Sequence, residues 1–187
     1  KASEIVFDLY SKNAEQLGLV MQQMKLTQEE ENNLIDPKAY MRGLPLNVRL
    51  RSMIFCFMSF NLLEQLNIPF ITFFQFMMLY QTIGRNLPYH NIDQALDCLQ
   101  CVYVILKLTG VNKSFESVEL FALLMAALLH NTNHQGEHGG LLAKTRLPLE
   151  ILFKNQPHAE TYQADFAIQI LTNKSVTILD SLSDDSQ

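Results

Sequence analysis

Apolar residues recur every three to four positions along nearly the whole chain, and this spacing constrains the fold more than any other feature. It places the apolar side chains on one face of an α-helix. Alternating polar and apolar runs between Asn-Gly or Gly-Gly turns, which would predict β-hairpins, do not occur. With 187 residues, 48% of them hydrophobic, the chain can bury the core of one domain. We therefore expect an all-α fold, a multi-helix bundle.

Prolines and capping residues predict where the helices begin. A proline can start a helix but cannot continue one, so Pro45, Pro69 and Pro88 each precede a predicted helix. The helices are expected over residues 1–24, 47–67, 69–84, 91–109, 114–129 with Ser114 as the N-cap, and 158–172, with short pieces over 141–155. Residues 26–36, which carry three consecutive glutamates, are predicted to form a polar connector. The chain is accordingly divided into an N-terminal helix and acidic connector, 1–44, and a helical domain, 45–187.

Charge and hydropathy exclude several classes of partner. Lys and Arg number 14 against 19 Asp and Glu, a net charge of −5, so the chain has no basic field to hold a nucleic acid or an anionic membrane. The most apolar region, 53–83, is interrupted by Pro69 and several polar residues, which leaves no stretch of the ~18 apolar residues that a membrane span needs. The three cysteines form no even framework and the N-terminus is unlike a signal peptide, so a cytoplasmic location is expected.

Histidines gather around the end of the most apolar predicted helix. The run "VELFALLMAALL" is apolar on all sides, which predicts a helix at the centre of the bundle with His130 at the base of an enclosed cavity. His130 and His134 lie four residues apart, a spacing that could place two ligands of one metal ion on a helix face. Gly136 and the polar letters "NTNHQG" indicate that the helix ends here. The alternative is therefore a pair of polar histidines at a helix end.

Two other patterns are typical of packing. Cys98 and Cys101 spell C-x-x-C, but they lie in an apolar helical pattern with no second pair, so buried or half-buried helix cysteines are favoured over a zinc or redox site. The run "FITFFQFMMLY" likewise predicts core packing and not a ligand pocket.

Three segments follow one another in a characteristic order: "PYHNIDQALDCLQCVYVIL", "LFALLMAALLHNTNHQG" and "HAETYQADFAIQIL". The arrangement resembles the catalytic domain of class I 3',5'-cyclic-nucleotide phosphodiesterases, which carries H-N-x-x-H, then H-D-x-x-H-x-G, then a helix led by Glu. The resemblance covers residues 45–187 and implies the N-terminal half, or somewhat more, of that HD-type helical domain. The bundle is therefore expected to be incomplete at its C-terminal end, with the family's last metal-binding Asp and nucleotide-gripping Gln lying beyond the chain.

Several residues match the family's site. By the resemblance, His90 takes the position of the histidine that protonates the leaving ribose oxygen, with Tyr89 and Asn91 flanking it. His134 matches the end of the second motif. Glu160 takes the position of the Glu that orders water around the second metal ion.

The metal-ligand positions are altered. The resemblance implies that His130 retains one ligand position, whereas Gln94 replaces a metal-binding His and Asn131 replaces the Asp that bridges the two ions. A neutral amide cannot balance a second cation and is a poor substitute for an imidazole, and a catalytic zinc ordinarily takes about three protein ligands. The neutral side chain of Asn131 can form hydrogen bonds with its neighbours. A buried Asp without a cation would instead lose its hydration with no compensating charge. The sequence thus predicts a metal site that has been converted to a metal-free one by neutral substitutions.

We expect a phosphodiesterase-like pseudoenzyme without a cofactor, an interaction or structural module in an intracellular assembly, with a protein partner or oligomer covering the helices at 91–109 and 158–172. One alternative is a metal-dependent phosphodiesterase that uses zinc and magnesium to hydrolyse cAMP or cGMP to the 5'-monophosphate, completed by sequence beyond this chain. That enzyme could rebuild its metal site with His138, His158 or Glu160. A less favoured alternative is a sensor that binds a cyclic nucleotide without cleaving it. These residues do not choose between cAMP and cGMP.

Overall fold

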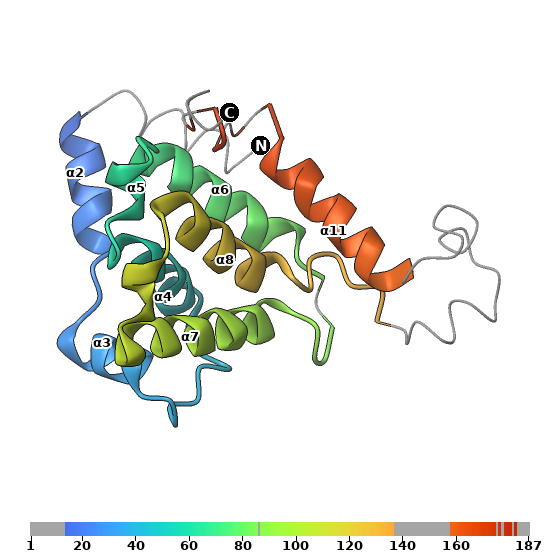
Figure 1. Cartoon of the computed structure of the whole chain (residues 1–187), viewed down its shortest axis with the longest axis horizontal. Coiled ribbons are helices and arrows are strands. Elements are labelled where there is room, and N and C mark those ends of the chain that lie inside the picture. Colours follow the sequence, from blue (N-terminus) through green and yellow to red (C-terminus); the bar gives the residue numbers. More distant parts are fainter. Residues whose placement is uncertain are drawn as a thin grey trace.

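The computed structural model describes residues 14–85, 87–136, 158–174, 176, 178–180 and 182, and over these residues the chain is helical. This confirms the all-α prediction. The elements are α2 (Ala14–Gln23), α3 (Gln28–Ile35), α4 (Leu46–Met58), α5 (Leu62–Gln65), α6 (Phe70–Ile83), α7 (Ile92–Thr109), the 3₁₀-helix η1 (Val111–Ser114), α8 (Ser117–Leu129) and α11 (His158–Leu171). Helix α7 packs against α3, α4 and α8, and α11 lies at the edge of the bundle (Figure 1).

Aromatic and aliphatic side chains of α4, α6, α7 and α8 form the core. The ring of Phe57 lies 4.9 Å from that of Phe73 and 5.7 Å from that of Phe121, measured between centroids. Phe73, Phe76 and Met77 of the aromatic run are fully buried, which confirms its predicted packing role. The large side chains with under 2% exposure are Phe57, Phe73, Phe76, Leu34, Met53, Ile54, Leu62, Met77, Leu96, Leu99, Leu124 and Leu128.

Local signals define α7 as the sequence predicts. The side chain of Asn91 accepts hydrogen bonds from the backbone N–H groups of Asp93 and Gln94, so Asn91 is the N-cap. At the other end Gly110 has φ of 70°, the left-handed C-terminal conformation in which glycine avoids a steric penalty. The predicted helix 91–109 is therefore confirmed to within a residue.

Two predicted helix boundaries are wrong. The single helix expected over 47–67 is broken into α4 and α5, because the chain turns at Asn61, whose φ of 57° lies in the left-handed region that asparagine tolerates. Ser114 does not cap α8. It lies at the end of η1, and Glu116 occupies the N-cap position, with its backbone N–H donating to the carboxylate of Glu119 at 2.9 Å. Residues 141–155 and 1–13 lie outside the described residues.

The acidic segment predicted to be a connector forms helix α3. Thr27 and Glu30 make a capping box that starts this helix, and Glu30 also forms an ion pair with Arg51 of α4. Leu34 is fully buried in the common core. The segment is polar in composition, but one face of its helix, which carries Leu34, packs into the core.

Gln100 of α7 attaches the end of α3 to the bundle. Its buried side-chain amide donates to the carbonyl oxygens of Leu34 at 3.3 Å and Asp36 at 3.1 Å, and lies 3.5 Å from that of Asn33. The last carbonyl groups of a helix lack partners within the helix. The carbonyl oxygens of Asn33 and Asp36 also accept from the backbone N–H groups of Asp36 and Ala39. Gln100 therefore matters most as the donor to the buried carbonyl oxygen of Leu34.

Gln100→Leu is expected to lower the free energy of unfolding by about 1–3 kcal/mol, the cost of leaving the buried carbonyl oxygen of Leu34 without a donor. Denaturant unfolding would measure it. The control is Gln169→Leu on the exposed surface of α11, where a change within about 0.5 kcal/mol is expected. Equal stabilities of the two variants would contradict this role of Gln100.

The apolar helix α8 lies inside the bundle as predicted, except for a narrow exposed stripe formed by Val118, Ala122 and Ala126. The cysteine prediction is half correct: Cys98 on α7 is half-buried, but Cys101 is exposed because it lies on the solvent face of the helix. None of the described helices has the length and hydropathy required to cross a bilayer.

Candidate functional site

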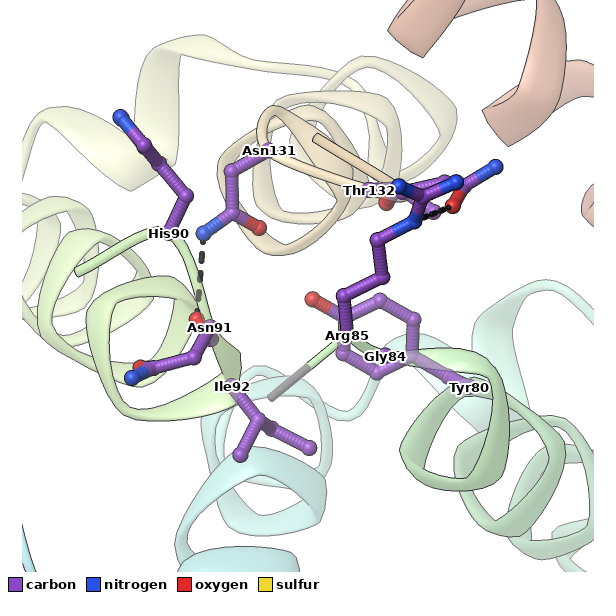
Figure 2. A pocket seen from close by; sticks show the side chains of 9 residues that line it. Tyr80, Gly84, Arg85, His90, Asn91, Ile92, Asn131 and Thr132 are labelled. Carbon is purple, nitrogen blue, oxygen red and sulfur yellow. Dashed lines mark hydrogen bonds between the residues drawn. The ribbon is translucent and has the colours of Figure 1, made fainter. Parts of the chain in front are cut away.

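The residues predicted to form a site meet where α6 ends, α7 begins and α8 ends (Figure 2). His90 and Asn91 directly precede α7, and Gln94 lies in its first turn. His130 and Asn131 follow the last residue of α8. Asn91 holds this corner together, because it caps α7 and its side-chain amide donates to the carbonyl oxygen of Leu87 at 2.8 Å. The fold thus brings together two motifs that lie about forty residues apart.

Amide groups link Gln94, His130 and Asn131, which the resemblance predicts to be metal-ligand positions. The side-chain NH₂ of Asn131 donates to the carbonyl oxygen of Asn91 at 3.1 Å, as the dashed line in Figure 2 marks, and also to the side-chain oxygen of Gln94. The side-chain nitrogen of Gln94 lies 2.8 Å from Nε2 of His130. Both N–H bonds of the Asn131 amide therefore have acceptors, and the side chain of Gln94 is bound at both ends.

The tautomer of His130 follows from its partners. Its Nδ1 lies 2.8 Å from the carbonyl oxygen of Ala127, which can only accept, so Nδ1 carries the hydrogen. Nε2 then carries the lone pair, and it accepts from the side-chain amide of Gln94. The lone pair by which a histidine would bind a metal ion is already in use.

These residues do not fit the metal centre that the family plan implies. His130 directs its unprotonated nitrogen to an N–H group, and Asn131 presents donors where a ligand must present an oxygen lone pair. In the part of the chain that the structure describes, no three His, Cys, Asp or Glu side chains converge closely enough to hold an ion. His138 and the side chain of His158, offered as replacement ligands, lie outside that part.

The position of His130 corrects one prediction. It was expected at the base of an enclosed cavity, but its side chain is exposed, and its neighbour Asn131, with only 6% exposure, is the buried residue. The reason is that the backbone of His130 is still helical, with φ of −54° and ψ of −30°, so its side chain lies four residues after Ala126 and continues the exposed stripe of α8. The cavity beside Asn131 measures about 10 Å³, room for about one water molecule.

His90 and His134 stack on each other. Their ring centroids are 3.7 Å apart with an interplanar angle of 18°, and Nδ1 of His134 accepts from the backbone N–H of Gly136 at 2.9 Å. The two histidines of the HxxxH spacing therefore do not converge on one point, since His130 pairs with Gln94 and His134 pairs with His90.

Burial lowers the pKa of His134 below its ordinary value. The neighbouring His90 and Arg85 act in the same direction, whereas the carboxylate of Glu160 on α11 opposes them. His134 is accordingly held in its neutral form, which suits an acceptor of the Gly136 N–H.

This pKa shift predicts a loss of stability in mild acid. Because the folded pKa of His134 lies below the unfolded value of about 6.5, the unfolded chain binds more protons between the two, so the stabilisation is complete above that pH and lost as the pH falls through the folded pKa. His134→Asn keeps an acceptor for the Gly136 N–H and removes the titration. We expect the melting temperature of the parent to fall more than that of the variant between about pH 7.5 and 5.5. Parallel curves would contradict this.

Asn133 joins three elements that the sequence did not connect. Its side-chain oxygen accepts from Nε of Arg85 at 2.6 Å, and its NH₂ donates to the hydroxyl of Tyr162 on α11 at 2.6 Å. Its φ of 55° is left-handed, and this conformation turns the chain away from α8. Arg85 was missed because it lies outside the family motifs. Tyr162 lies in the segment led by Glu160, but nothing in the sequence pairs it with Asn133. The one available signal was that residue 133 is another amide in the "NTNHQG" segment.

The remaining predicted site residues lie further from the amide network. Tyr89 is exposed, and the guanidinium of Arg42 lies over its ring, 4.7 Å from the centroid. The rings of Tyr89 and His90 meet at nearly a right angle, with their centroids 5.0 Å apart. Glu160 is exposed in the first turn of α11 and acts on the site through its charge beside His134. The structure thus assembles His90, Gln94, His130, Asn131 and His134, with Tyr89 and Glu160 at the rim.

Comparison of folds defines the class of this helical domain. The phosphodiesterase domain of a rhodopsin phosphodiesterase fusion protein from the choanoflagellate Salpingoeca rosetta superposes with a TM-score of 0.75 and 25% identity, over 81% of this chain and 48% of that domain. LmjPDEB1, solved in complex with IBMX, shares the fold with a TM-score of 0.73 and 22% identity, over 86% of this chain and 54% of its own. The chain therefore has the fold of part of a phosphodiesterase catalytic domain.

Sequence comparison supplies the family. The profile described as 3'5'-cyclic nucleotide phosphodiesterase matches residues 89–187, more than half of the chain, so the chain belongs to this family. The cGMP-specific 3',5'-cyclic phosphodiesterases of Drosophila virilis and Drosophila melanogaster are each 29% identical over 133 residues, 71% of this chain. Those residues make up 15% and 12% of the two relatives, respectively. The resemblance deduced from the motifs is confirmed.

Proposed function

We propose that this chain is a phosphodiesterase-like module that does not hydrolyse cyclic nucleotides by the family's two-metal route, and that it serves as an interaction or structural module in an intracellular assembly. One observation carries the proposal: the side-chain amide of Gln94 occupies the lone pair of His130 and accepts from Asn131. The three family ligand positions are bound to one another and need no cation.

The hydrogen bonds of Asn131 favour this reading. To ligate an ion, the Asn131 amide would have to turn its oxygen toward the site, which breaks its two donor bonds and brings oxygen toward the acceptors on Asn91 and Gln94. Each buried polar group left without a partner costs about 1–3 kcal/mol. Metal binding is therefore opposed twice: two ligands are replaced, and the hydrogen bonds of Asn131 would also have to break.

The chemistry of hydrolysis depends on the missing ligands. A metal ion lowers the pKa of its bound water from about 15.7 to about 7, and without that effect the nucleophile is absent at neutral pH. His90 keeps the family's proton-donor position, but a general acid alone contributes only about 10²–10⁴-fold. Such a residual acid does not restore useful turnover.

An interaction role draws support from exposed apolar side chains on the two helices predicted to carry a partner. Ile105 and Leu108 of α7 are 58% and 63% exposed, and Ile168 of α11 is 58% exposed. Ile105 and Leu108 lie three residues apart and so on the same face of α7, and neighbouring exposed apolar side chains are typical of protein-binding surfaces. We propose a protein partner or oligomer on these faces and no resident cofactor.

A second candidate is an active phosphodiesterase that requires zinc and magnesium and additional sequence. The retained His90, His130, His134 and Glu160 favour it, and the relatives described as cGMP-specific make cGMP the first substrate to assay, with cAMP beside it. A sensor that binds a cyclic nucleotide without cleaving it predicts saturable nucleotide binding with no turnover.

The first test restores the ligands. In the double variant Gln94→His, Asn131→Asp, His130 would be joined by a second imidazole and a carboxylate, the three protein ligands that a catalytic zinc ordinarily takes. We expect the parent to contain no stoichiometric metal after dialysis against zinc. The double variant is expected to bind about one zinc per chain, at least about 100-fold more tightly than the parent. Elemental analysis and competition with a chelating dye measure both.

A third substitution provides the control. Adding His130→Ala to the double variant removes one ligand and should abolish the gained affinity. Stoichiometric metal in the parent, together with turnover of cGMP or cAMP in zinc and magnesium, would reject the proposal and favour the second candidate.

A further inference from the structure

A second cavity lies at the opposite end of α7 from the histidines. It measures about 450 Å³, within the range of about 300–1,000 Å³ that is typical of small-molecule sites. Its walls come from the chain between α4 and α5, the last turn of α7 with η1, and the start of α8. Lys107, which lines it, is sixteen residues from Asn91 along α7, or roughly 24 Å. The cavity is thus separate from the site described above.

Lys107 is the charged group of this cavity. Its amine donates to the carbonyl oxygen of Ser59 at 3.1 Å and lies 4.5 Å from the centroid of the Phe60 ring. The side chain is half-buried, and burial lowers its pKa; the buried thiol of Cys56 is the other group that acts on it. Capping the end of α4 uses one of the three N–H groups of the ammonium, so two are left for another acceptor.

Lys107 differs from the other half-buried cations in its partners. Three described arginines are similarly half-buried, and each forms an ion pair. The pairs are Arg42–Asp97, Arg49–Asp93 and Arg51–Glu30. Among the described residues Lys107 pairs with no acidic side chain, although the chain as a whole carries a net charge of −5. A half-buried cation without a counter-ion beside an open cavity suits an anionic ligand.

The other wall residues suit the same ligand. Asn61, Gln65 and Asn112 contribute side-chain amides. The oxygen of Gln65 already accepts from the hydroxyl of Ser117 at 2.5 Å, so its NH₂ is the group that can serve a ligand. Phe115 is 39% exposed and adds an apolar wall. The wall thus combines one positive charge, amide donors and an aromatic ring.

We propose that this cavity binds a small molecule bearing an oxyanion, a carboxylate or a phosphate, with Lys107 as its charge partner, the wall amides as additional donors and Phe115 against its apolar part. The site is independent of the proposed loss of metal chemistry.

The test is a titration of the full 187-residue chain with two probes, inorganic phosphate and benzoate, followed by the backbone amide chemical shifts. We expect saturable shifts confined to residues 59–65 and 107–117 for at least one probe, with affinity in the low millimolar range or tighter. Lys107→Gln keeps a donor for the Ser59 carbonyl but removes the charge, and it should weaken binding at least about tenfold. Lys113→Gln, on η1 outside the cavity wall, is the matched control and should bind as the parent does.

The two probes identify the ligand. Binding of benzoate that is weakened by Phe115→Ala assigns a carboxylate with an aromatic group, whereas binding of phosphate alone that is indifferent to Phe115→Ala assigns a phosphate. If circular dichroism shows that Lys107→Gln is unfolded, Asn112→Leu takes its place and must lower the affinity for the probe at least about threefold. Non-saturating shifts with both probes, unchanged affinity in Lys107→Gln, or equal losses in Lys107→Gln and Lys113→Gln would overturn the proposal.

Discussion

Asn131→Asp is expected to destabilise the folded chain by about 2–4 kcal/mol at neutral pH, although it introduces the residue that the resemblance predicts for this position in the family. The side chain of Asn131 is almost fully buried and donates both N–H bonds, to the Asn91 carbonyl and to the Gln94 side chain. A carboxylate donates none, so a buried charge would face two oxygen atoms. Denaturant unfolding measures the loss.

The dependence of this loss on pH follows from the same physical cause. In the folded Asn131→Asp variant, burial and the facing oxygens raise the pKa of the introduced carboxyl. The deficit relative to the parent is therefore full above the folded pKa and shrinks as the pH falls through it, because a protonated carboxyl can donate again. Zinc should stabilise the Gln94→His, Asn131→Asp variant and leave the single variant unchanged.

Asn133→Asp is the matched control for this prediction. It is the same chemical change two residues away, but Asn133 is half-buried and its oxygen already accepts from Arg85, so a carboxylate there would gain an ion pair. Its loss of the bond to Tyr162 can be offset because the phenol can donate. We expect a change within about 1 kcal/mol. Equal destabilisation at both positions would contradict the prediction that the buried hydrogen bonds of Asn131 make a carboxylate costlier there than at position 133.

Phe57→Ala is expected to cost about 3–5 kcal/mol, the range for removing a buried aromatic side chain and leaving a cavity. Phe57 is fully buried between Phe73 of α6 and Phe121 of α8, so its removal loosens three helices at once. The measurement is the free energy of unfolding from chemical denaturation, with calorimetry as a second probe.

The neighbouring residue gives the control. Met58 is 40% exposed at the end of the same helix, and Met58→Ala is expected to change stability by less than about 1 kcal/mol. A small effect of Phe57→Ala would mean that the core around α4 relaxes to fill the space, which would contradict the tight aromatic packing described here.

Helices with strong local signals were predictable, and those that depend on packing were not. Asn91 and Gly110 fixed the two ends of α7 through capping chemistry that acts within a few residues. Helix α3 was missed because its composition is polar and only one face, with Leu34, meets the core. The break between α4 and α5 was missed because a left-handed Asn61 leaves no mark in the apolar spacing.

The membership of the site was predictable, but its bonding was not. The motifs identified His90, Gln94, His130 and Asn131 as neighbours, and the structure brings them together. The sequence placed two amides, Gln94 and Asn131, at positions where the resemblance predicts metal ligands. That they bind each other and His130 became evident only from the distances.

The sequence by itself determined the helical class, because periodicity and capping are local properties that can be read without coordinates. The order of its motifs indicated the family by resemblance, and the same resemblance predicts that Gln94 and Asn131 replace two metal ligands. Tertiary structure alone decided that Gln94 occupies the lone pair of His130, that His134 stacks on His90, and that Lys107 lies beside a cavity without an acidic partner among the described residues. The physical reason is that hydrogen-bond partners and burial depend on segments that lie tens of residues apart and meet only when the helices pack.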